Sequence, residues 1–412
     1  MSDIIQNHYY KVEYTKFEIN TAAGDTVSID NTILGSLELF ESLDQPGITG
    51  NISLLDFAGI IEVYNVTAGD TLTFKFKSPG QSGSIGGTYI ITGVVLNQFP
   101  EHDYLSVYTR LEFCSKWFLD ARVTQYSNLW KNQSLDKIAT DIIEFCGGTI
   151  GTIAPSKIIL EHFGTPYWTP LHILYYLLGF YGEGMTMFPD IKTDKVNIIP
   201  LNSIFSGDIG IYPYKFLTMP TNTNYEALVF QMTLEESADF TKYLSNGLAG
   251  IVPNVFNFDT GQFQTPNPNT LPTTVNFEHL TKYSQITQNY NTAKYYNNEQ
   301  LSIFPQSKTP VSLTQLNNIV SNIQKTQYIR LFADAVKLNI IAVGSSARKV
   351  GQICSIDIPS LNDNKSKPNK VFSGNWVISH IKRVFTGSNY KEMIGLINTG
   401  TMSSINPNLV KW

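Results

Sequence analysis

The feature that most constrains the fold of this chain is an internal repeat, in which a stretch near the N-terminus resembles one near the C-terminus. Residues 68–74 read AGDTLTF and residues 350–356 read VGQICSI, so each places a glycine-led turn before an alternating strand. Further on, residues 87–92 (GTYIIT) and 374–379 (GNWVIS) share one order of glycine, small polar, aromatic, β-branched, isoleucine and hydroxyl residues. Alternation of this kind is typical of half-buried strands, so both ends are predicted to hold β-structure.

A third element follows in the same order in each copy. Tyr104 and Tyr390 each precede a closing strand, at residues 105–111 and 391–397, and the spacing from the preceding aromatic residue is nearly equal in the two copies. Glycine turns followed by strands are common in β proteins, so chance likeness is the alternative explanation. Three elements in one order at near-equal spacing favour two copies of one small barrel, with a domain inserted between them.

The rest of the N-terminal region also reads as short strands. The candidates are separated by turns rich in Gly, Asp, Asn and Pro, and they lie at residues 12–19, 37–40, 48–55, 71–76, 89–96 and 105–113. Several short strands at this spacing are typical of a barrel or sandwich. Residues 1–113 are therefore predicted to form the first β-barrel.

Residues 114–215 change character and are predicted to form the first part of an inserted α+β domain. One helix is expected over Leu135–Phe145, because Ser134 is a favourable N-cap before an apolar face. A second helix is expected over residues 171–181, because Pro170 suits the first helical position.

The C-terminal part returns to β-structure after a polar excursion. Residues 216–245 are expected to be the first strands of the second barrel. Residues 246–325 are expected to be an irregular excursion that includes the start of a helix after Ser312, and residues 326–400 are expected to complete the barrel. Residues 401–412 read as a tail. The predicted fold is mainly β, of the α+β class, with two similar small antiparallel β-barrels at the chain ends and an inserted mixed α/β domain.

The composition of the chain excludes several classes of function. Only 15 % of the residues are charged, against about 25 % in an average soluble domain, and the net charge is −5. A chain without a basic excess is a poor candidate for holding nucleic acid electrostatically. The three cysteines have neither disulfide-framework nor zinc-site spacing. No signal peptide opens the chain, and the longest apolar run, residues 171–181, is far shorter than the roughly 20 residues of a membrane span. A soluble protein made in a cytoplasm is therefore expected.

Motifs for catalysis, metals and phosphate are not found in the sequence. It has no GxSxG elbow, no HExxH and no GxxxxGK[ST] loop, so we predict no catalytic residue, no metal and no cofactor. Acidic residues that could pair for glycan hydrolysis read as solvated turn carboxylates; they are Glu161, Glu183, Glu235, Glu236 and Asp239. The basic residues Lys382 and Arg383 also read as a solvated patch. These observations favour a structural interaction protein over an enzyme.

The strands at both ends resemble a known family. Residues 48–56 (ITGNISLLD), followed by the turn at Gly69 and Asp70, resemble the opening barrel of phage baseplate hub proteins. The late strands resemble the second barrel of the same proteins, at residues 338–345, 350–358, 372–379 and 390–397. The family is that of the central hub of T-even-type contractile tails, which is related to the hub half of type VI secretion spike proteins.

This resemblance implies a structural protein of the virion tail baseplate that is assembled in the host cytoplasm without membrane insertion. Hubs of this kind are homotrimers whose two tube-like barrels per subunit make a pseudo-sixfold ring. One face would receive the hexameric tail tube or its initiator proteins, and the other would hold a trimeric central spike. The lumen would hold the tape-measure protein and later pass DNA without binding it specifically. The chain has no appended spike repeats and no lysozyme-like motif, so the spike and any wall hydrolysis are expected in partner chains.

Residues near the strand turns are predicted to lie where such a ring packs. They are Ile52, Leu54, Gly69, Asp70, Tyr89, Gly351, Trp376 and Tyr390. One alternative is the hub of a non-contractile tail or another injection system. A second is a glycan-binding or peptidoglycan-degrading virion protein, with Glu161 or Glu183 acting beside Tyr167 and Trp168. A third is a β-rich binding module that forms no ring.

Overall fold

The computed structural model describes the protein over fourteen segments: residues 12–30, 32–57, 59–78, 84–101, 104–156, 158–182, 184–207, 211–217, 227–236, 255–257, 262–264, 301–303, 336–357 and 373–398. The helix predicted after Ser312 and the tail at residues 401–412 lie outside the described residues. Of the predicted excursion over 246–325, three short strands are described, β15 (Val255–Asn257), β16 (Gln262–Gln264) and β17 (Leu301–Ile303), which pair with one another.

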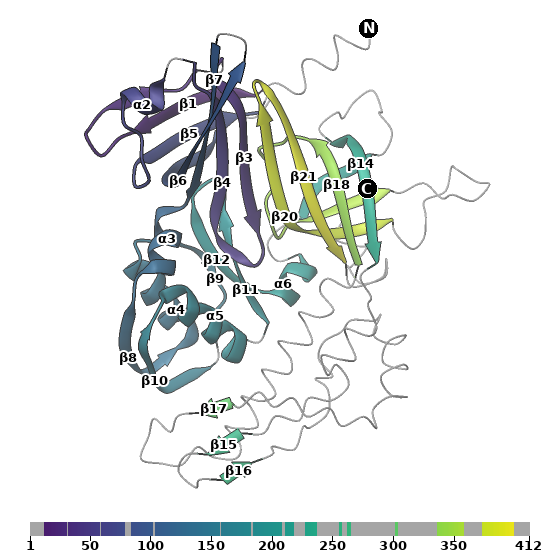
Figure 1. Ribbon diagram of the computed structural model, residues 1–412. Coiled ribbons are helices and arrows are strands. Elements are labelled where there is room, and N and C mark those ends of the chain that lie inside the picture. The colour runs from purple at the N-terminus through teal and green to yellow at the C-terminus, as the bar shows by residue number, and fades with distance from the viewer. Residues whose placement is uncertain are drawn as a thin grey trace, which may run out of the picture.

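Thirteen of the described strands form one large, mainly antiparallel sheet (Figure 1). Its N-terminal strands are β1 (Glu13–Asn20), β2 (Thr26–Ser28), β3 (Leu34–Ser42), β4 (Gln45–Leu55), β5 (Thr71–Lys77), β6 (Ile85–Glu101) and β7 (Tyr104–Cys114). Its later strands are β13 (Ile211–Leu217), β14 (Val229–Glu236), β18 (Val336–Val343), β19 (Ile353–Asp357), β20 (Gly374–Thr386) and β21 (Asn389–Asn398). The prediction of a mainly β fold of the α+β class is confirmed.

The strands of the two chain ends lie side by side in this sheet. The order runs β14-β18-β21-β20-β3-β4-β7-β6-β5-β1-β2, and β19 and β13 attach beside β20. In Figure 1 the yellow C-terminal strands therefore stand against the purple N-terminal ones. The sequence patterns predicted two small antiparallel β-barrels at the chain ends. In the described residues the strands of both ends instead belong to one sheet, in which the two sets are joined edge to edge.

The N-terminal strands and the C-terminal strands each form most of one hydrophobic core. Alternation places Leu37, Leu39 and Ile52 on the buried faces of β3 and β4, and all three are at most 1 % exposed. The two cores also meet, because Phe385 and Tyr390 of the late strands pack against Phe76 of β5, with ring centroids 4.5 and 5.5 Å away. The two cores therefore pack against each other and stabilise one continuous sheet.

A third core belongs to the region between the two ends (Figure 1). It is built by the helices α3 (Lys116–Val123), α4 (Leu135–Phe145) and α5 (Pro170–Tyr181), with the strands β8 (Tyr126–Ser134), β9 (Ile150–Ile153), β10 (Ile159–Trp168), β11 (Met185–Asp190) and β12 (Lys195–Pro200). The helix α6 (Leu201–Ser206) follows β12 and packs into the core of the C-terminal strands instead. A short helix, α2 (Ile60–Val63), lies apart from the third core, between β4 and β5.

The two helices predicted in this region are confirmed. The first, α4, begins after Ser134 as predicted, although that side chain makes no cap hydrogen bond. The second, α5, begins at Pro170 after Thr169, whose side chain accepts a hydrogen bond from the backbone N–H of His172. Local capping signals were sufficient here because each helix starts and ends within a few residues of them.

Other elements of this region could not be predicted from the periodicity of the sequence. The strand β11 reads MTMFPD and is buried at its first five positions, so it lacks the alternation by which half-exposed strands are recognised. Glu161, which was expected in a turn, lies within β10 instead. Strands covered on both faces are the ones that periodicity alone misses.

Candidate assembly interface

The predicted repeat is present in the hydrogen-bonded pairing of the strands. In the first copy β5 pairs with β6, and in the second β19 pairs with β20. The pairs correspond one by one: Thr71–Ile90 with Ile353–Val377, Leu72–Tyr89 with Cys354–Trp376, Thr73–Thr88 with Ser355–Asn375, and Phe74–Gly87 with Ile356–Gly374. The residues matched by sequence are therefore also matched in register.

The glycine turns before these strands repeat as well. In the first copy the N–H of Gly69 donates to the carbonyl of Ile91 at 2.8 Å. In the second copy the N–H of Gly351 donates to the carbonyl of Ile378, also at 2.8 Å. Both glycines have positive φ, +105° and +84°, which a residue without Cβ adopts at low cost.

Each copy carries two β-bulges at equivalent positions. Thr92 is the extra residue between β6 and β7, and Ser379 is the extra residue between β20 and β21. A second bulge falls at Gly35 in β3 and at Phe230 in β14. Bulges bend a strand and fix its register, so their recurrence makes a chance likeness untenable.

The equivalence extends to five strands of each copy. The strands β3-β4-β7-β6-β5 of the first unit correspond in order to β14-β18-β21-β20-β19 of the second. For example, Ile52 pairs with Leu111 where Ile340 pairs with Ile394. Below, these two sets of five strands are called the first and second units.

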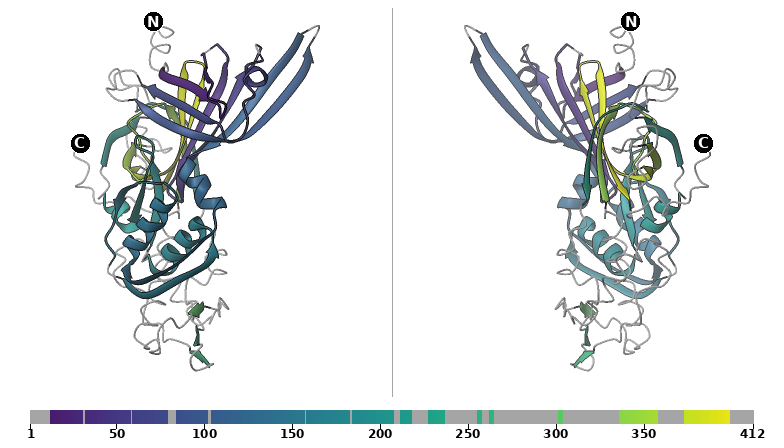
Figure 2. Two further views of the ribbon diagram at one scale, coloured as in Figure 1. Left: turned by 90° about the vertical axis from the view of Figure 1, so that its left-hand side faces the viewer. Right: turned by 90° about the vertical axis from the view of Figure 1, so that its right-hand side faces the viewer.

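One part of the sequence match is wrong. Tyr104 and Tyr390 were taken as equivalent, but Tyr104 pairs with Glu101 beside its turn, whereas Tyr390 pairs with Phe385. Counted from the bulges, the residue equivalent to Tyr390 is Val107. The β6–β7 hairpin is longer than the β20–β21 hairpin, and Figure 2 shows the longer hairpin, in blue, standing out from the body of the molecule.

The two units meet where β20 pairs with β3. The edge of β20 is divided, because residues 374–377 pair with β19 of their own unit and residues 380–385 pair with β3 of the other. This second contact, from His380–Ser42 to Phe385–Leu37, is called the internal seam below. It joins the second unit to the first within one chain.

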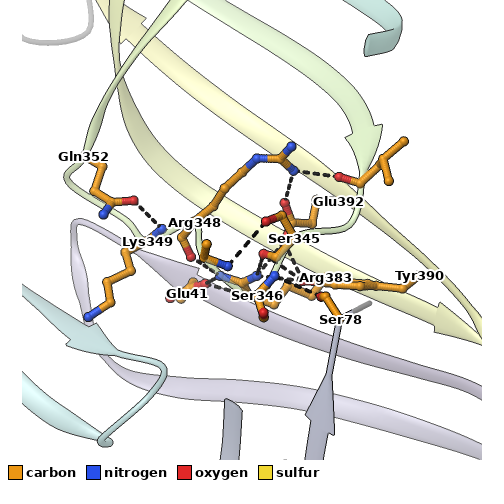
Figure 3. Close-up of polar contacts among 12 residues, drawn as sticks. Glu41, Ser78, Ser345, Ser346, Arg348, Lys349, Gln352, Arg383, Tyr390 and Glu392 are labelled. Atoms are coloured by element: carbon orange, nitrogen blue, oxygen red, sulfur yellow. Dashed lines mark hydrogen bonds and ion pairs between the residues drawn. The ribbon is translucent and has the colours of Figure 1, made fainter. Parts of the chain in front are cut away.

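A buried cluster of charges fixes the internal seam (Figure 3). Arg383 on β20 contacts Glu41 on β3 and Glu392 on β21, each with an N–O distance of 2.5 Å. Arg348 contacts the other oxygen of Glu392. The four side chains are at most 1 % exposed. Two guanidinium groups and two carboxyl groups thus form one cluster that is closed off from the protein surface.

Burial and ion pairing shift the pKa values of these groups in opposite directions. Burial raises the pKa of the Glu41 carboxyl to about 7, while Arg383 lowers it. Burial alone would lower the pKa of Arg383, but Glu41, Tyr390 and Glu392 outweigh it and hold that pKa well above its ordinary value. The prediction that Arg383 belongs to a solvated patch is wrong, because its partners lie on strands far away in the sequence.

The residues predicted to lie where the ring packs are found inside the fold of the single chain. Gly69 and Gly351 form the repeated turns, and Asp70 accepts hydrogen bonds at 2.8 Å from the backbone N–H groups of Ala22 and Thr67. The other five are 2 % exposed or less: Ile52, Leu54, Tyr89, Trp376 and Tyr390. They build the repeat unit, and their part in contacts between subunits stays a prediction.

Surface residues that the sequence did not single out lie on β14, which ends the strand order, and on the part of β6 that extends beyond its pairing with β5. Val95 and Leu96 on β6 are 45 % and 54 % exposed, and Phe230 on β14 is 44 % exposed. Single exposed apolar residues are ordinary, so only their place in the repeat could have identified them. That place is visible once the bulges align the two units.

The residues of the alternative glycan site are described only in part. Tyr167 is 74 % exposed, while the ring of Trp168 packs against His172 and Tyr176. Glu183 lies outside the described residues. Among the residues that the structure describes, no group of three or more His, Cys, Asp and Glu side chains could hold a metal ion. No helix in that same part of the chain is long and apolar enough to cross a membrane.

Comparisons with known proteins find the fold but no sequence relative. No family model and no curated protein matches the chain. The solved tail protein of Neisseria meningitidis MC58 superposes with a TM-score of 0.57 at 9 % identity, over 96 % of this chain and 99 % of that one. The 43 kDa tail protein of prophage MuSo2 from Shewanella oneidensis gives a TM-score of 0.55 at 10 % identity, over 94 % and 99 % of the two chains. The chain therefore shares its fold with both along nearly its whole length.

Proposed function

We propose that this protein is a structural hub of a phage tail baseplate, built as a homotrimeric ring. The observation that carries the proposal is the repeat of five strands with matching register, turns and bulges. Three chains with two similar units each present six similar units around one axis. A ring of this kind has threefold symmetry in its chains and pseudo-sixfold symmetry in its units.

Such a ring suits a protein that joins parts of different symmetry. The six units would contact a hexameric tail tube or its initiator proteins, and the threefold arrangement of the chains would hold a trimeric central spike. Closing the ring also covers the outer sheet strands, which otherwise expose backbone groups for pairing. The two solved structures compared above are tail proteins with the same fold, and the sequence resembles hubs of contractile tails.

The lumen of the ring would contain the tape-measure protein and later pass DNA. A net charge of −5 agrees with a channel that does not hold DNA. The proposed role needs no catalysis and no cofactor, and it places the protein in the virion after assembly in the host cytoplasm.

The proposal is tested by the absolute mass of the purified chain in solution, measured by light scattering alone and with the candidate spike protein. A mass of about 138 kDa, three times the 46.1 kDa of one chain, is expected. A chain that stays at 46.1 kDa with and without the spike would contradict the ring.

A further inference from the structure

The internal seam is a template for a contact between two copies of the chain. It joins β20 of the second unit to β3 of the first, in antiparallel register. Because the units repeat strand by strand, β20 has an equivalent in β6, and β3 has an equivalent in β14. The same contact can therefore form once more, between β6 of one chain and β14 of another.

Each of the two strands that would form it has an edge, or part of one, without a strand partner among the described residues. Past the bulge at Thr92, β6 pairs with β7 on one side, and in the described part of the chain no strand lies on its other side. Similarly, β14 ends the strand order and, among the strands described, pairs with β18. Strand edges of this length pair readily with another chain, and Val95 and Leu96 on β6 add exposed apolar surface.

We propose that β6 of one copy pairs with β14 of a second copy in the register of the internal seam, an inference that rests on the proposed ring. The internal pairs transfer through the bulges to give the intermolecular pairs Val94–Glu236, Val95–Glu235, Leu96–Leu234, Asn97–Thr233 and Gln98–Met232. Two different edges meet, so the contact is heterologous and leads to a closed ring or an open filament. Three copies close the ring of the proposed function.

The chemistry of the two seams decides which edges meet. In the internal seam Arg383 neutralises Glu41 on β3. The position equivalent to Arg383 on β6 is Leu96, which carries no charge. Pairing of β6 with β3 would leave the Glu41 carboxyl buried without its guanidinium, and unpaired buried charges are strongly disfavoured. The strand β3 therefore selects β20 of its own chain, and β6 is left for β14 of the next.

Paired cysteines test the register directly. Asn97 and Thr233 are both exposed and would lie opposite each other between chains, so Asn97→Cys with Thr233→Cys is expected to form an intermolecular disulfide under mild oxidation. The matched control is Val95→Cys with Gln231→Cys. In the proposed register Gln231 lies four positions from the partner of Val95, or roughly 13 Å along the strand, beyond disulfide reach. The three native cysteines are buried.

The disulfides are read on non-reducing gels, and the solution mass of each variant is measured in parallel. A trimer in which the first pair gives covalent oligomers and the control pair does not supports the inference. A trimer in which the first pair stays reduced, or both pairs oxidise equally, overturns the register and leaves the ring standing. A monomer that forms neither disulfide overturns both the register and the ring.

Discussion

At the scale of single residues, Arg383 connects strands that lie far apart in the chain. Its partner Glu41 is 342 residues away in sequence, and its other partner, Glu392, also contacts Arg348. A buried pair of this kind contributes little net stability while intact, but removing one partner is strongly destabilising because a charge is left unpaired. The cluster therefore specifies how the two units align more than it stabilises them.

Glu392→Gln is the change that tests this role, because it keeps the shape of the side chain and removes its charge. The two buried guanidinium groups of the cluster would then have one carboxylate left, that of Glu41, which contacts Arg383. We expect the free energy of unfolding to fall by about 3–5 kcal/mol, measured by urea denaturation. The control is Glu112→Gln, whose carboxylate pairs with Arg110 while half exposed, and which should change stability by about 1 kcal/mol or less. Equal losses in the two variants would contradict the assigned role.

A partly buried acid, Asp194, gives the stability a dependence on pH. The Asp194 carboxyl accepts a hydrogen bond from the Ser115 hydroxyl at 2.7 Å, yet burial raises its pKa from 3.8 to about 6. A folded-state pKa above the unfolded value means that the stabilisation is present below pH 3.8 and is lost as the pH rises through 6.

Asp194→Asn is expected to remove that loss. Asparagine keeps the acceptor oxygen for Ser115 and tolerates the left-handed backbone at this position, where φ is +52°. The variant should unfold with a free energy up to about 3 kcal/mol higher than the parent at pH 8, since one pKa unit corresponds to about 1.4 kcal/mol. Near pH 4 the two proteins should differ little. A difference of the same size at both pH values would show that ionisation is not its cause.

At the scale of elements, the pairs that follow the two equivalent bulges combine a small and a large residue in opposite order. In the first unit Gly93 lies opposite Glu112, and in the second His380 lies opposite Gly395. A Cβ at Gly395 would overlap the ring of His380, whereas a Cβ at Gly93 would reach Glu112 at an ordinary 3.6 Å. Each unit thus leaves room for one large side chain beside its bulge.

Alanine at these two glycines should therefore have unequal effects. Gly395→Ala is expected to lower the unfolding free energy by about 1–3 kcal/mol through overpacking, while Gly93→Ala at the equivalent position changes it little. Thermal and urea unfolding measure both. The double variant His380→Ala with Gly395→Ala should recover part of the loss, because the overlapping ring is gone. A Gly395→Ala protein as stable as Gly93→Ala would refute the packing argument.

The elements also show how far the sequence could predict this fold. The pairing of β5 with β6 and of β19 with β20 was predictable, because turn glycines such as Gly69 and Gly351 are local signals. The register of the closing strands was not, since hairpin length is set by pairing partners and Tyr104 marks only the turn. The burial of Arg383 depends on Glu41, which no local pattern connects to it. The exposed residues of β6 and β14 could not be linked to assembly from the sequence, because that link depends on the alignment of the two units in three dimensions.

At the scale of the whole molecule, assembly should depend on one exposed side chain of β6. Leu96→Asp places a charge on the edge that we propose to pair with β14, and it is expected to shift the solution mass from trimer toward monomer. The matched control is Leu129→Asp on β8, since Leu96 and Leu129 are each 54 % exposed. The control should keep the mass of the parent. Light scattering on both variants, with circular dichroism to verify folding, decides the outcome, and an unchanged trimer for Leu96→Asp would count against the β6 edge.

The internal seam also affects how such a ring responds to dilution. Of the six junctions in a ring of three chains, three lie within a chain and form when that chain folds, whatever the protein concentration. The other three form between chains and obey mass action. Diluting the ring would therefore open every second junction and release intact pairs of units, with the charges around Arg383 still sealed inside each pair.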